Sequence, residues 1–280
     1  MGASAKRDAG SPVLRTAPDR LLTFVEQLQA SGRYSFDRAE ALSALHTSEE
    51  ALKKAARRLA LKRRLASPRR GFFVIVPVEY RSSGAPPPAW FIDALMRYEG
   101  RPYYVALLSA AALHGAAHQQ PQEFEVMTDR PLRPSRVGRS RIRFFTKRRV
   151  AATATTKLKT ETGEMVVSTP ATTALDLVRY APVLGGLGAV LSVLSELAEK
   201  LDAAALVKAA EGERNLALAQ RTGFLLERSG AASGVIEPLA TWIATQAPRP
   251  VALRSDRDVE GVTTDARWQV LVNEAVEVDP

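Results

Sequence analysis

Short amphipathic segments followed by extended ones make up the first part of the chain. Apolar side chains recur every three or four positions over residues 19–30, over 37–45 and from residue 47 onwards, which is the period of a helix with one buried face. Residues 34–36 are short and extended, and residues 65–76 have the pattern of two strands around a Pro- and Gly-containing turn. This order of helix, strand, helix, helix and hairpin predicts a winged helix-turn-helix domain.

The third helix has a predicted start and a predicted core face. Thr47-Ser48-Glu49-Glu50 matches the capping box Thr-x-x-Glu, in which the first hydroxyl and the last carboxylate each accept a hydrogen bond from a backbone amide. Lysines and arginines fill most of the positions that the apolar residues leave, so we expect this helix to pack on one face and expose cations on the other. The apolar residues at helical spacing are Leu52, Ala55, Ala56 and Leu59.

Residues 81–88 (RSSGAPPP) mark the clearest domain boundary, because prolines after a glycine form an extended, semi-rigid spacer. After it, the pattern predicts a small sheet flanked by helices. Helices are expected over 90–98, 103–113, 170–180, most of 186–229 and 236–245, and strands over 122–127, 140–145, 164–168 and 268–272. The predicted fold class is α+β, with a disordered lead (1–18), a winged helix-turn-helix (19–80), a linker (81–88) and a mixed α/β domain (89–280).

Charge is unevenly divided along the chain. The net charge is +9, but residues 1–150 carry 27 Lys and Arg against 13 Asp and Glu, whereas residues 151–280 carry 12 against 17. A basic half joined to a mildly acidic half suggests that the basic half meets a polyanion such as nucleic acid.

The densest cationic run, residues 53–70, contains nine Lys and Arg and no acid. In a winged helix-turn-helix, the start of the third helix reaches base edges in the major groove, while cations along the helix and on the wing hold phosphates. A solvated helix face is the alternative, but such faces normally mix both signs of charge. The predicted DNA-binding residues are Thr47, Ser48, Glu49, Lys53, Lys54, Arg57, Arg58, Lys62, Arg63, Arg64, Arg69 and Arg70.

A second run, residues 130–149, also contains nine Lys and Arg and no acid. Arginines alternate with other residues along its predicted strand, so one strand face would be cationic. This face either binds nucleic acid or protein, or protects an exposed sheet edge from aggregation. The members of this candidate patch are Arg139, Arg141, Arg143, Lys147, Arg148 and Arg149.

Signatures of enzymes, metal sites and membrane spans are missing. Without any Cys the chain has no disulfide, thiolate zinc site or cysteine nucleophile, and it contains no P-loop, G-x-S-x-G elbow or H-E-x-x-H motif. Glu123 and Glu125 alone are weak support for a nuclease, and Gly115 breaks the helix between His114 and His118. No segment approaches the length of apolar residues that a membrane span needs. We therefore expect a cytoplasmic, non-enzymatic protein with no metal, cofactor or membrane contact.

Motifs in a fixed order resemble the AbiEi family of bacterial antitoxins over about residues 20–275. The basic wing sequence Arg69-Arg70-Gly71-Phe72-Phe73-Val74 is one, and the helix from Tyr103-Tyr104-Val105 to Leu113-His114-Gly115 is similar to the family's helix ending in Leu-His-Gly. Val167-Ser168-Thr169-Pro170 with Asp176 resembles its Ser-x-Pro-x-x-Thr-x-x-Asp motif, although Thr172 stands where the family commonly has an arginine. Residues 221–227 and 268–273 are also family-like.

The resemblance implies an antitoxin of a type IV, abortive-infection toxin–antitoxin system. Proteins of this family bind repeats in their own promoter through the winged helix and repress transcription, and their C-terminal domain counteracts a nucleotidyltransferase-class toxin without requiring a stable complex. The implied partners are double-stranded promoter DNA with inverted repeats and a cognate toxin, with the protein a monomer or a DNA-dependent dimer. The residues alone equally allow an ordinary winged-helix transcriptional regulator whose second domain senses a ligand or dimerises.

Overall fold

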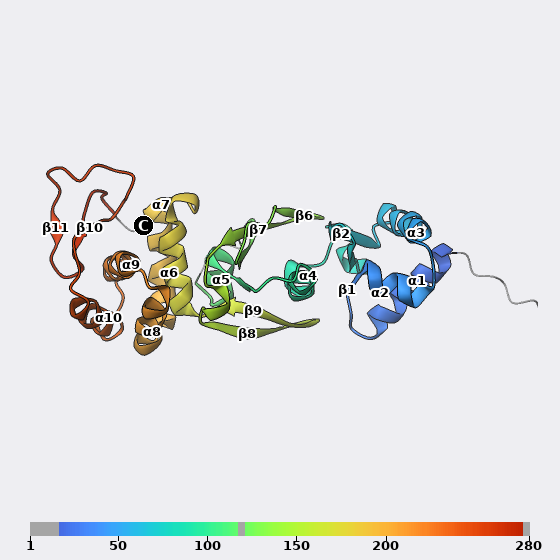
Figure 1. Cartoon of the computed structure of the whole chain (residues 1–280), viewed down its shortest axis with the longest axis horizontal. Coiled ribbons are helices and arrows are strands. Elements are labelled where there is room, and N and C mark those ends of the chain that lie inside the picture. The colour runs from blue at the N-terminus through green and yellow to red at the C-terminus, as the bar shows by residue number, and fades with distance from the viewer. Residues whose placement is uncertain (1–16, 117–120, 277–280) are drawn as a thin grey trace, which may run out of the picture. The chain divides into compact units, whose positions relative to one another are not determined.

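The computed structural model describes residues 17–116 and 121–276. The chain divides into two compact units, Met1–Pro86 and Pro87–Pro280, and the division falls within the Pro-rich segment 81–88. The lead predicted for residues 1–18 lies outside the described residues except for its last two, which begin the first helix. Figure 1 shows the elements of both units.

The first unit is built from helices and a small antiparallel sheet. The helices are α1 (Ala17–Ala30), α2 (Arg38–Leu45) and α3 (Glu49–Leu61), and the strand order is β1 (Ser35–Asp37), β3 (Phe72–Ile75), β2 (Leu65–Arg69). The element order is the predicted one and is compatible with a winged helix-turn-helix in which the β2–β3 hairpin is the wing. The apolar faces enclose a core of Leu21, Val25, Leu28, Phe36, Ala41, Leu52, Ala55, Ala56, Leu59, Leu65 and Ile75.

Side chains cap α2 and α3, and one cap differs from the sequence prediction. Asp37 Oδ1 accepts a hydrogen bond from the Glu40 amide at 2.9 Å, as expected. Helix α3 is capped by Ser48, whose Oγ accepts from the Ala51 amide at 3.3 Å. The predicted capping box at Thr47 is therefore wrong by one residue. Because Glu50 is only two positions beyond Ser48, its carboxylate takes no part in the cap and pairs instead with Lys54 at 2.7 Å.

A six-stranded mixed sheet opens the second unit. Strand β4 pairs antiparallel with β5 and parallel with β9, β5 pairs parallel with β7, and the hairpins β6–β7 and β8–β9 form the two edges. The strand order is β6 (Ser135–Val137), β7 (Ser140–Thr146), β5 (Phe124–Thr128), β4 (Tyr103–Val105), β9 (Gly163–Ser168) and β8 (Thr155–Thr160).

Helices pack on this sheet and continue beyond it as a bundle, which Figure 1 shows around α6. The helices are α4 (Ile92–Tyr98), α5 (Leu107–Leu113), α6 (Pro170–Tyr180), α7 (Gly186–Leu197), α8 (Ala203–Glu213), α9 (Leu216–Arg228) and α10 (Ser233–Thr245). Short 3-10 helices lie between elements: η1 (Val78–Tyr80), η2 (Pro88–Trp90), η3 (Val150–Ala152), η4 (Ala181–Val183) and η5 (Ala198–Lys200). A small sheet of β10 (Val251–Ala252), β12 (Val270–Leu271) and β11 (Thr264–Asp265) follows α10.

Helix α6 lies at the centre of the second unit's core. It contacts α5, α7, α8 and α9, and every residue from Ala171 to Val178 is buried. The polar members of this stretch are satisfied internally: Thr173 Oγ1 donates to the Thr169 carbonyl, and Thr172 Oγ1 donates to the Ala154 carbonyl at 2.9 Å. Thr172, at the position where an arginine was expected from the family resemblance, therefore joins α6 to the segment before β8.

The α+β class is confirmed, but one predicted helix is wrong. Residues 103–113 form β4 followed by α5, because Tyr104 and Val105 are buried in the middle of the sheet. A short apolar run does not distinguish a strand from a helix, and aromatic and β-branched residues fit strands well. Leu107 has a φ of 53°, a left-handed conformation that changes the chain direction where the strand gives way to the helix. The edge strands β6 and β8 were not predicted.

Candidate nucleic-acid interface and charged cleft

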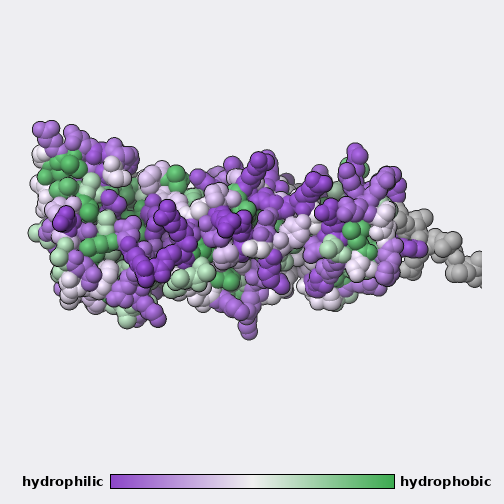
Figure 2. Space-filling view, in the orientation of Figure 1, coloured by the Kyte–Doolittle hydropathy of each residue, from purple (hydrophilic) through white to green (hydrophobic). Residues whose placement is uncertain are grey.

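Helix α3 carries cations beside its buried stripe. Lys53 and Arg57, one turn apart, line a groove of about 610 Å³ between α3 and the β2–β3 hairpin, and Arg70 of the hairpin turn lines it too. Hydrophilic residues dominate the surface over α3 in Figure 2. The predicted recognition helix and wing thus share one groove. The predicted core positions Leu52, Ala55, Ala56 and Leu59 are all buried.

Some of the predicted DNA-binding residues are already engaged within the first unit. The Ser48 hydroxyl caps α3, and Glu49 Oε2 accepts from Arg38 at 3.2 Å. Lys54 pairs with Glu50, and Arg64 pairs with Glu26 at 3.2 Å. Most of these side chains are solvent-exposed, and exposed pairs contribute little to stability and exchange readily for a phosphate.

Other cations of this run make no ion pair with any residue that the structure describes. They are Lys53, Arg57, Arg58, Lys62 and Arg63, all exposed. Thr47 is half-buried ahead of the Ser48 cap. Arg69 ends β2, and Arg70 precedes Gly71 in the tight turn of the hairpin, where Gly71 has a φ of 85°.

The second cationic run is divided among different environments. Arg139 lies in the turn before β7 and not on the strand, whereas Arg141 and Arg143 both pair with Glu123, at 2.9 and 3.5 Å. Of the three arginines expected on one strand face, Arg139 is therefore not on the strand, and Arg141 and Arg143 are partly neutralised, because Glu123 comes directly before β5, the strand beside β7. Lys147 is buried, so it belongs to the interior and not to a surface patch.

Lys147 follows β7 directly and enters a buried cluster of charges. Its Nζ lies 3.0 Å from Asp176 Oδ1 and also pairs with Glu213, which in turn pairs with Arg179. The Tyr104 hydroxyl donates to the other oxygen of Asp176 at 2.7 Å. Two carboxylates thus meet two cations. Asp176, Lys147 and Glu213 are shielded from water and Arg179 is partly exposed, and each charge has a partner, the condition under which proteins tolerate buried charge.

Burial dominates the electrostatics of this cluster. Burial raises the pKa of Asp176, and the Lys147 ammonium and the Tyr104 hydroxyl oppose that shift. Burial, reinforced by the Asp176 charge, also raises the pKa of Tyr104 well above its ordinary value. Tyr104 therefore remains a hydrogen-bond donor at any physiological pH, and the cluster ties β4, the end of β7, α6 and α8 together.

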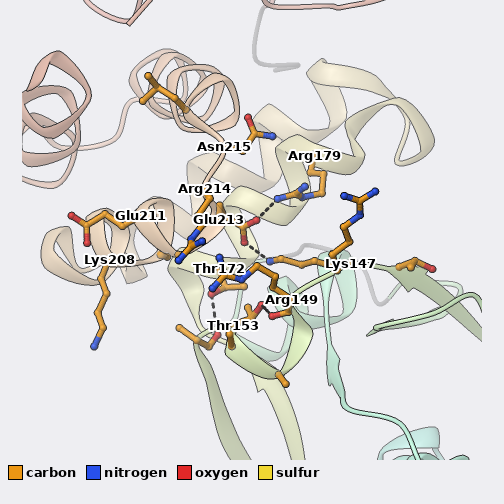
Figure 3. A pocket seen from close by; sticks show the side chains of 18 of the residues that line it. Lys147, Arg149, Thr153, Thr172, Arg179, Lys208, Glu211, Glu213, Arg214 and Asn215 are labelled. Atoms are coloured by element: carbon orange, nitrogen blue, oxygen red, sulfur yellow. Dashed lines mark hydrogen bonds and ion pairs between the residues drawn. The ribbon is translucent and has the colours of Figure 1, made fainter. Parts of the chain in front are cut away.

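Beside the cluster the surface is hollowed into a cleft of about 1200 Å³, shown in Figure 3. One wall is the segment after β7 with η3, and the other is formed by the ends of α6 and α8 and the start of α9. Arg148 and Arg149 line it from the first wall, and Lys208 and Arg214 from the second. Sequence reasoning missed Lys208 and Arg214, because they lie in the acidic half of the chain and the fold alone brings them to the basic run.

Glu125, considered above for a nuclease, is a buried structural group. Its Oε2 accepts from the Leu108 amide at 2.8 Å, and its own amide donates to Ser109 Oγ at 2.9 Å, so the residue secures the start of α5. Burial raises the pKa of Glu125 to about 7, against the effect of the backbone amides of Leu108 and Ser109. Its neighbour Glu123 is held by the β7 arginines.

Across residues 17–116 and 121–276, no three or more His, Asp or Glu side chains gather in a way that could hold a metal ion. His114 Nε2 contacts the Ser168 carbonyl oxygen at 2.7 Å, joining the end of α5 to the end of β9, and His118 lies outside the described residues. Within the same ranges, no helix is long and apolar enough to cross a membrane.

Comparisons with known proteins place the second unit in a family. Residues 104–228 match the family described as AbiEi antitoxin C-terminal domain. The crystal structure of the RV2827C protein from Mycobacterium tuberculosis is similar, with a TM-score of 0.63 over 92% of both chains at 16% sequence identity, a likeness of fold alone. No curated protein matches the sequence. The family match runs from Tyr104 on β4 to the last residue of α9, so it contains the whole charged cluster and its cleft, and it supports an AbiEi-family antitoxin.

Proposed function

We propose that this chain is the antitoxin and transcriptional autorepressor of a type IV toxin–antitoxin operon. The observation that carries the proposal is the match of residues 104–228 to the AbiEi antitoxin C-terminal domain, which supports an antitoxin role in a toxin–antitoxin system. The arrangement of the first unit, compatible with a winged helix-turn-helix, supports the regulatory role. The two roles then belong to different units of one chain.

The groove between α3 and the hairpin supports promoter binding. Lys53 and Arg57 lie one turn apart on the same side of α3, and Arg70 approaches from the hairpin, so a DNA backbone along the groove would meet cations from both. Lys53 and Arg57, which make no ion pair with any described residue, gain most from phosphate, because binding replaces only their hydration. We propose that α3 enters the major groove at inverted repeats in the chain's own promoter.

The second unit, in this proposal, counteracts a nucleotidyltransferase-class toxin without catalysis of its own. The charges of Lys147, Asp176, Glu213 and Arg179 satisfy one another, which suits a structural cluster better than a reactive one. In this proposal the antagonism takes place in the cytoplasm, and the surface of the second unit is what acts against the toxin.

Two readouts in one strain test the two roles. Cells would carry the toxin gene of the same operon and a reporter driven by its promoter, with either the wild-type chain or the double variant Lys53→Ala, Arg57→Ala. We expect the wild type to restore growth and repress the reporter, and the double variant to restore growth without repression. The variant Lys54→Ala, Arg58→Ala removes the same charge from positions outside the groove and should repress more strongly than the groove variant.

Each readout can contradict one half of the proposal. Failure of the wild type to restore growth, with a toxic partner and expression confirmed, would remove the antitoxin role. Repression without growth rescue would favour the alternative, a winged-helix regulator with a ligand-sensing second domain, for which the cleft in that domain is the favouring observation. Rescue with an unaffected reporter would remove the autorepressor role.

A further inference from the structure

The cleft of the second unit holds more positive charge than its carboxylates neutralise. Lysines and arginines on its lining outnumber glutamates by six to two. Lys147 and Arg179 are neutralised by the buried carboxylates of Asp176 and Glu213. The remaining carboxylate of the lining is Glu211, which is exposed. The remaining cations, all exposed and without an ion pair to any described residue, are Arg148, Arg149, Lys208 and Arg214.

These cations converge from two distant parts of the sequence. Arg149 precedes η3, and Arg214 follows directly after α8. Figure 3 shows both side chains pointing into the cleft, whereas Lys208 extends from its outer edge. Like charges gathered without an anion repel one another. Other arginines of this unit do have carboxylate partners, as Arg254 does in Asp256 and Glu274. Exposed arginines without a described ion pair also occur outside the cleft, as Arg136 and Arg139 do, but in the cleft four such cations line one concavity.

We propose that this cleft binds a phosphate-bearing ligand, with Arg149 and Arg214 as its main contacts. A guanidinium donates two parallel hydrogen bonds to a phosphate, and several such groups in one concavity match the closely spaced charges of a phosphate chain. The cleft is at least as large as typical small-molecule sites, so it accommodates a nucleotide or the end of a nucleic-acid strand. Nucleotides and nucleic-acid strands both present phosphate groups, so the same cations would bind either one. The proposal of a phosphate site does not depend on the antitoxin role.

Titration calorimetry on the full-length chain tests the assignment and separates the sources. The probes are inorganic triphosphate, ATP, adenosine and a short 5′-phosphorylated single-stranded DNA. The cleft variant is Arg149→Ala, Arg214→Gly; glycine adopts the left-handed conformation of residue 214 without strain, so the fold should survive. The matched control is Arg136→Ala, Arg139→Ala, which removes two exposed arginines outside the cleft. Lys208→Glu, at an exposed helical position, is a second probe of the same site.

Expected results are binding of triphosphate and ATP but not adenosine, weakened about tenfold or more in the cleft variant and unchanged in the control. Comparable affinities for triphosphate and ATP would identify the phosphates of a nucleotide as the ligand. A much higher affinity for the DNA, lost in the cleft variant, would identify a nucleic-acid strand as the ligand. Equal losses in the cleft variant and the control would overturn the proposal, because the binding would then follow net charge alone. Absence of binding to every phosphate probe would overturn it as well.

Discussion

The indole ring of Trp268 occupies the space that a side chain at Gly223 would need. A β-carbon at Gly223 would lie 2.0 Å from Cζ3 of the ring, far inside van der Waals contact. Trp268 is fully buried, and its Nε1 donates to Glu227 Oε2 at 2.6 Å, one turn further along α9. A glycine inside a helix costs about 0.5–1 kcal/mol relative to alanine; here it allows the segment before β12 to pack flat against α9.

Gly223→Ala should therefore destabilise the second unit. The methyl group must displace a fully buried ring, and overpacking a core of this kind typically costs about 1–3 kcal/mol, with the upper end expected for so close an approach. Urea unfolding followed by tryptophan fluorescence measures the change in unfolding free energy. Gly188→Ala, in α7, where a β-carbon meets nothing within 4 Å, is the control and should be neutral or slightly stabilising. Equal effects of the two substitutions would show that the ring does not require the glycine.

Lys147→Met should destabilise the second unit more than its exposed counterpart. The change leaves Asp176 and Glu213 buried with too little positive charge, and breaking a buried pair on one side costs about 3–5 kcal/mol. Lys157→Met is the matched control, because Lys157 Nζ lies 3.3 Å from Glu164 Oε2 on exposed strands. An exposed ion pair of this kind contributes about 0–1 kcal/mol to stability. Similar unfolding midpoints for the two variants in urea would contradict the structural role of the cluster.

The cluster also shows where sequence reasoning reached its limit. Local patterns predicted α3, its core face and the Asp37 cap, because each depends on neighbours within one or two turns. Lys147 was assigned to a surface patch because five of its neighbours in sequence are arginines, yet its partners Asp176 and Glu213 lie on helices α6 and α8, far away in sequence. Only the tertiary fold determines which member of a cationic run is buried.

The cleft was unpredictable for the same reason. Arg148 and Arg149 were identified as cations, but Lys208 and Arg214 lie in a helical stretch whose average charge is acidic. Likewise Glu123 neutralises Arg141 and Arg143 because β5 and β7 are neighbours in the sheet, which no period in the sequence specifies. Composition showed that the chain is basic, and the fold decides where that charge is left unpaired.

Promoter affinity should depend on salt in proportion to the phosphate contacts made by α3. Lys53→Ala, Arg57→Ala removes two cations from the groove. The slope of log affinity against log salt concentration should therefore become shallower by about 2, and binding should weaken across all DNA sequences. Fluorescence anisotropy with promoter DNA at several salt concentrations measures both. Lys54→Ala, Arg58→Ala should change the slope less, since neither residue lines the groove and Lys54 is paired with Glu50. A larger change from this second pair would place the DNA on the other side of α3.

Glu125 should make stability fall as pH rises through the neutral range. Burial raises its pKa from an ordinary 4.5 to about 7 in the folded chain, so between these values the folded chain holds a proton that the unfolded chain has released. The stability contributed by this group is complete below about pH 4.5 and is lost as pH rises through about 7.

Glu125→Gln removes this dependence while keeping an amide oxygen to accept from the Leu108 amide. The unfolding free energy of the variant relative to wild type should therefore rise between about pH 4.5 and 8, by up to roughly 3 kcal/mol for a shift of this size. Urea unfolding at a series of pH values measures the difference, and because other titrating groups are present in both proteins, their effects cancel. Glu161→Gln, in the exposed β8–β9 turn, controls for the loss of a surface carboxylate. A difference that stays flat across this range would mean that Glu125 is already ionised in the folded chain at low pH.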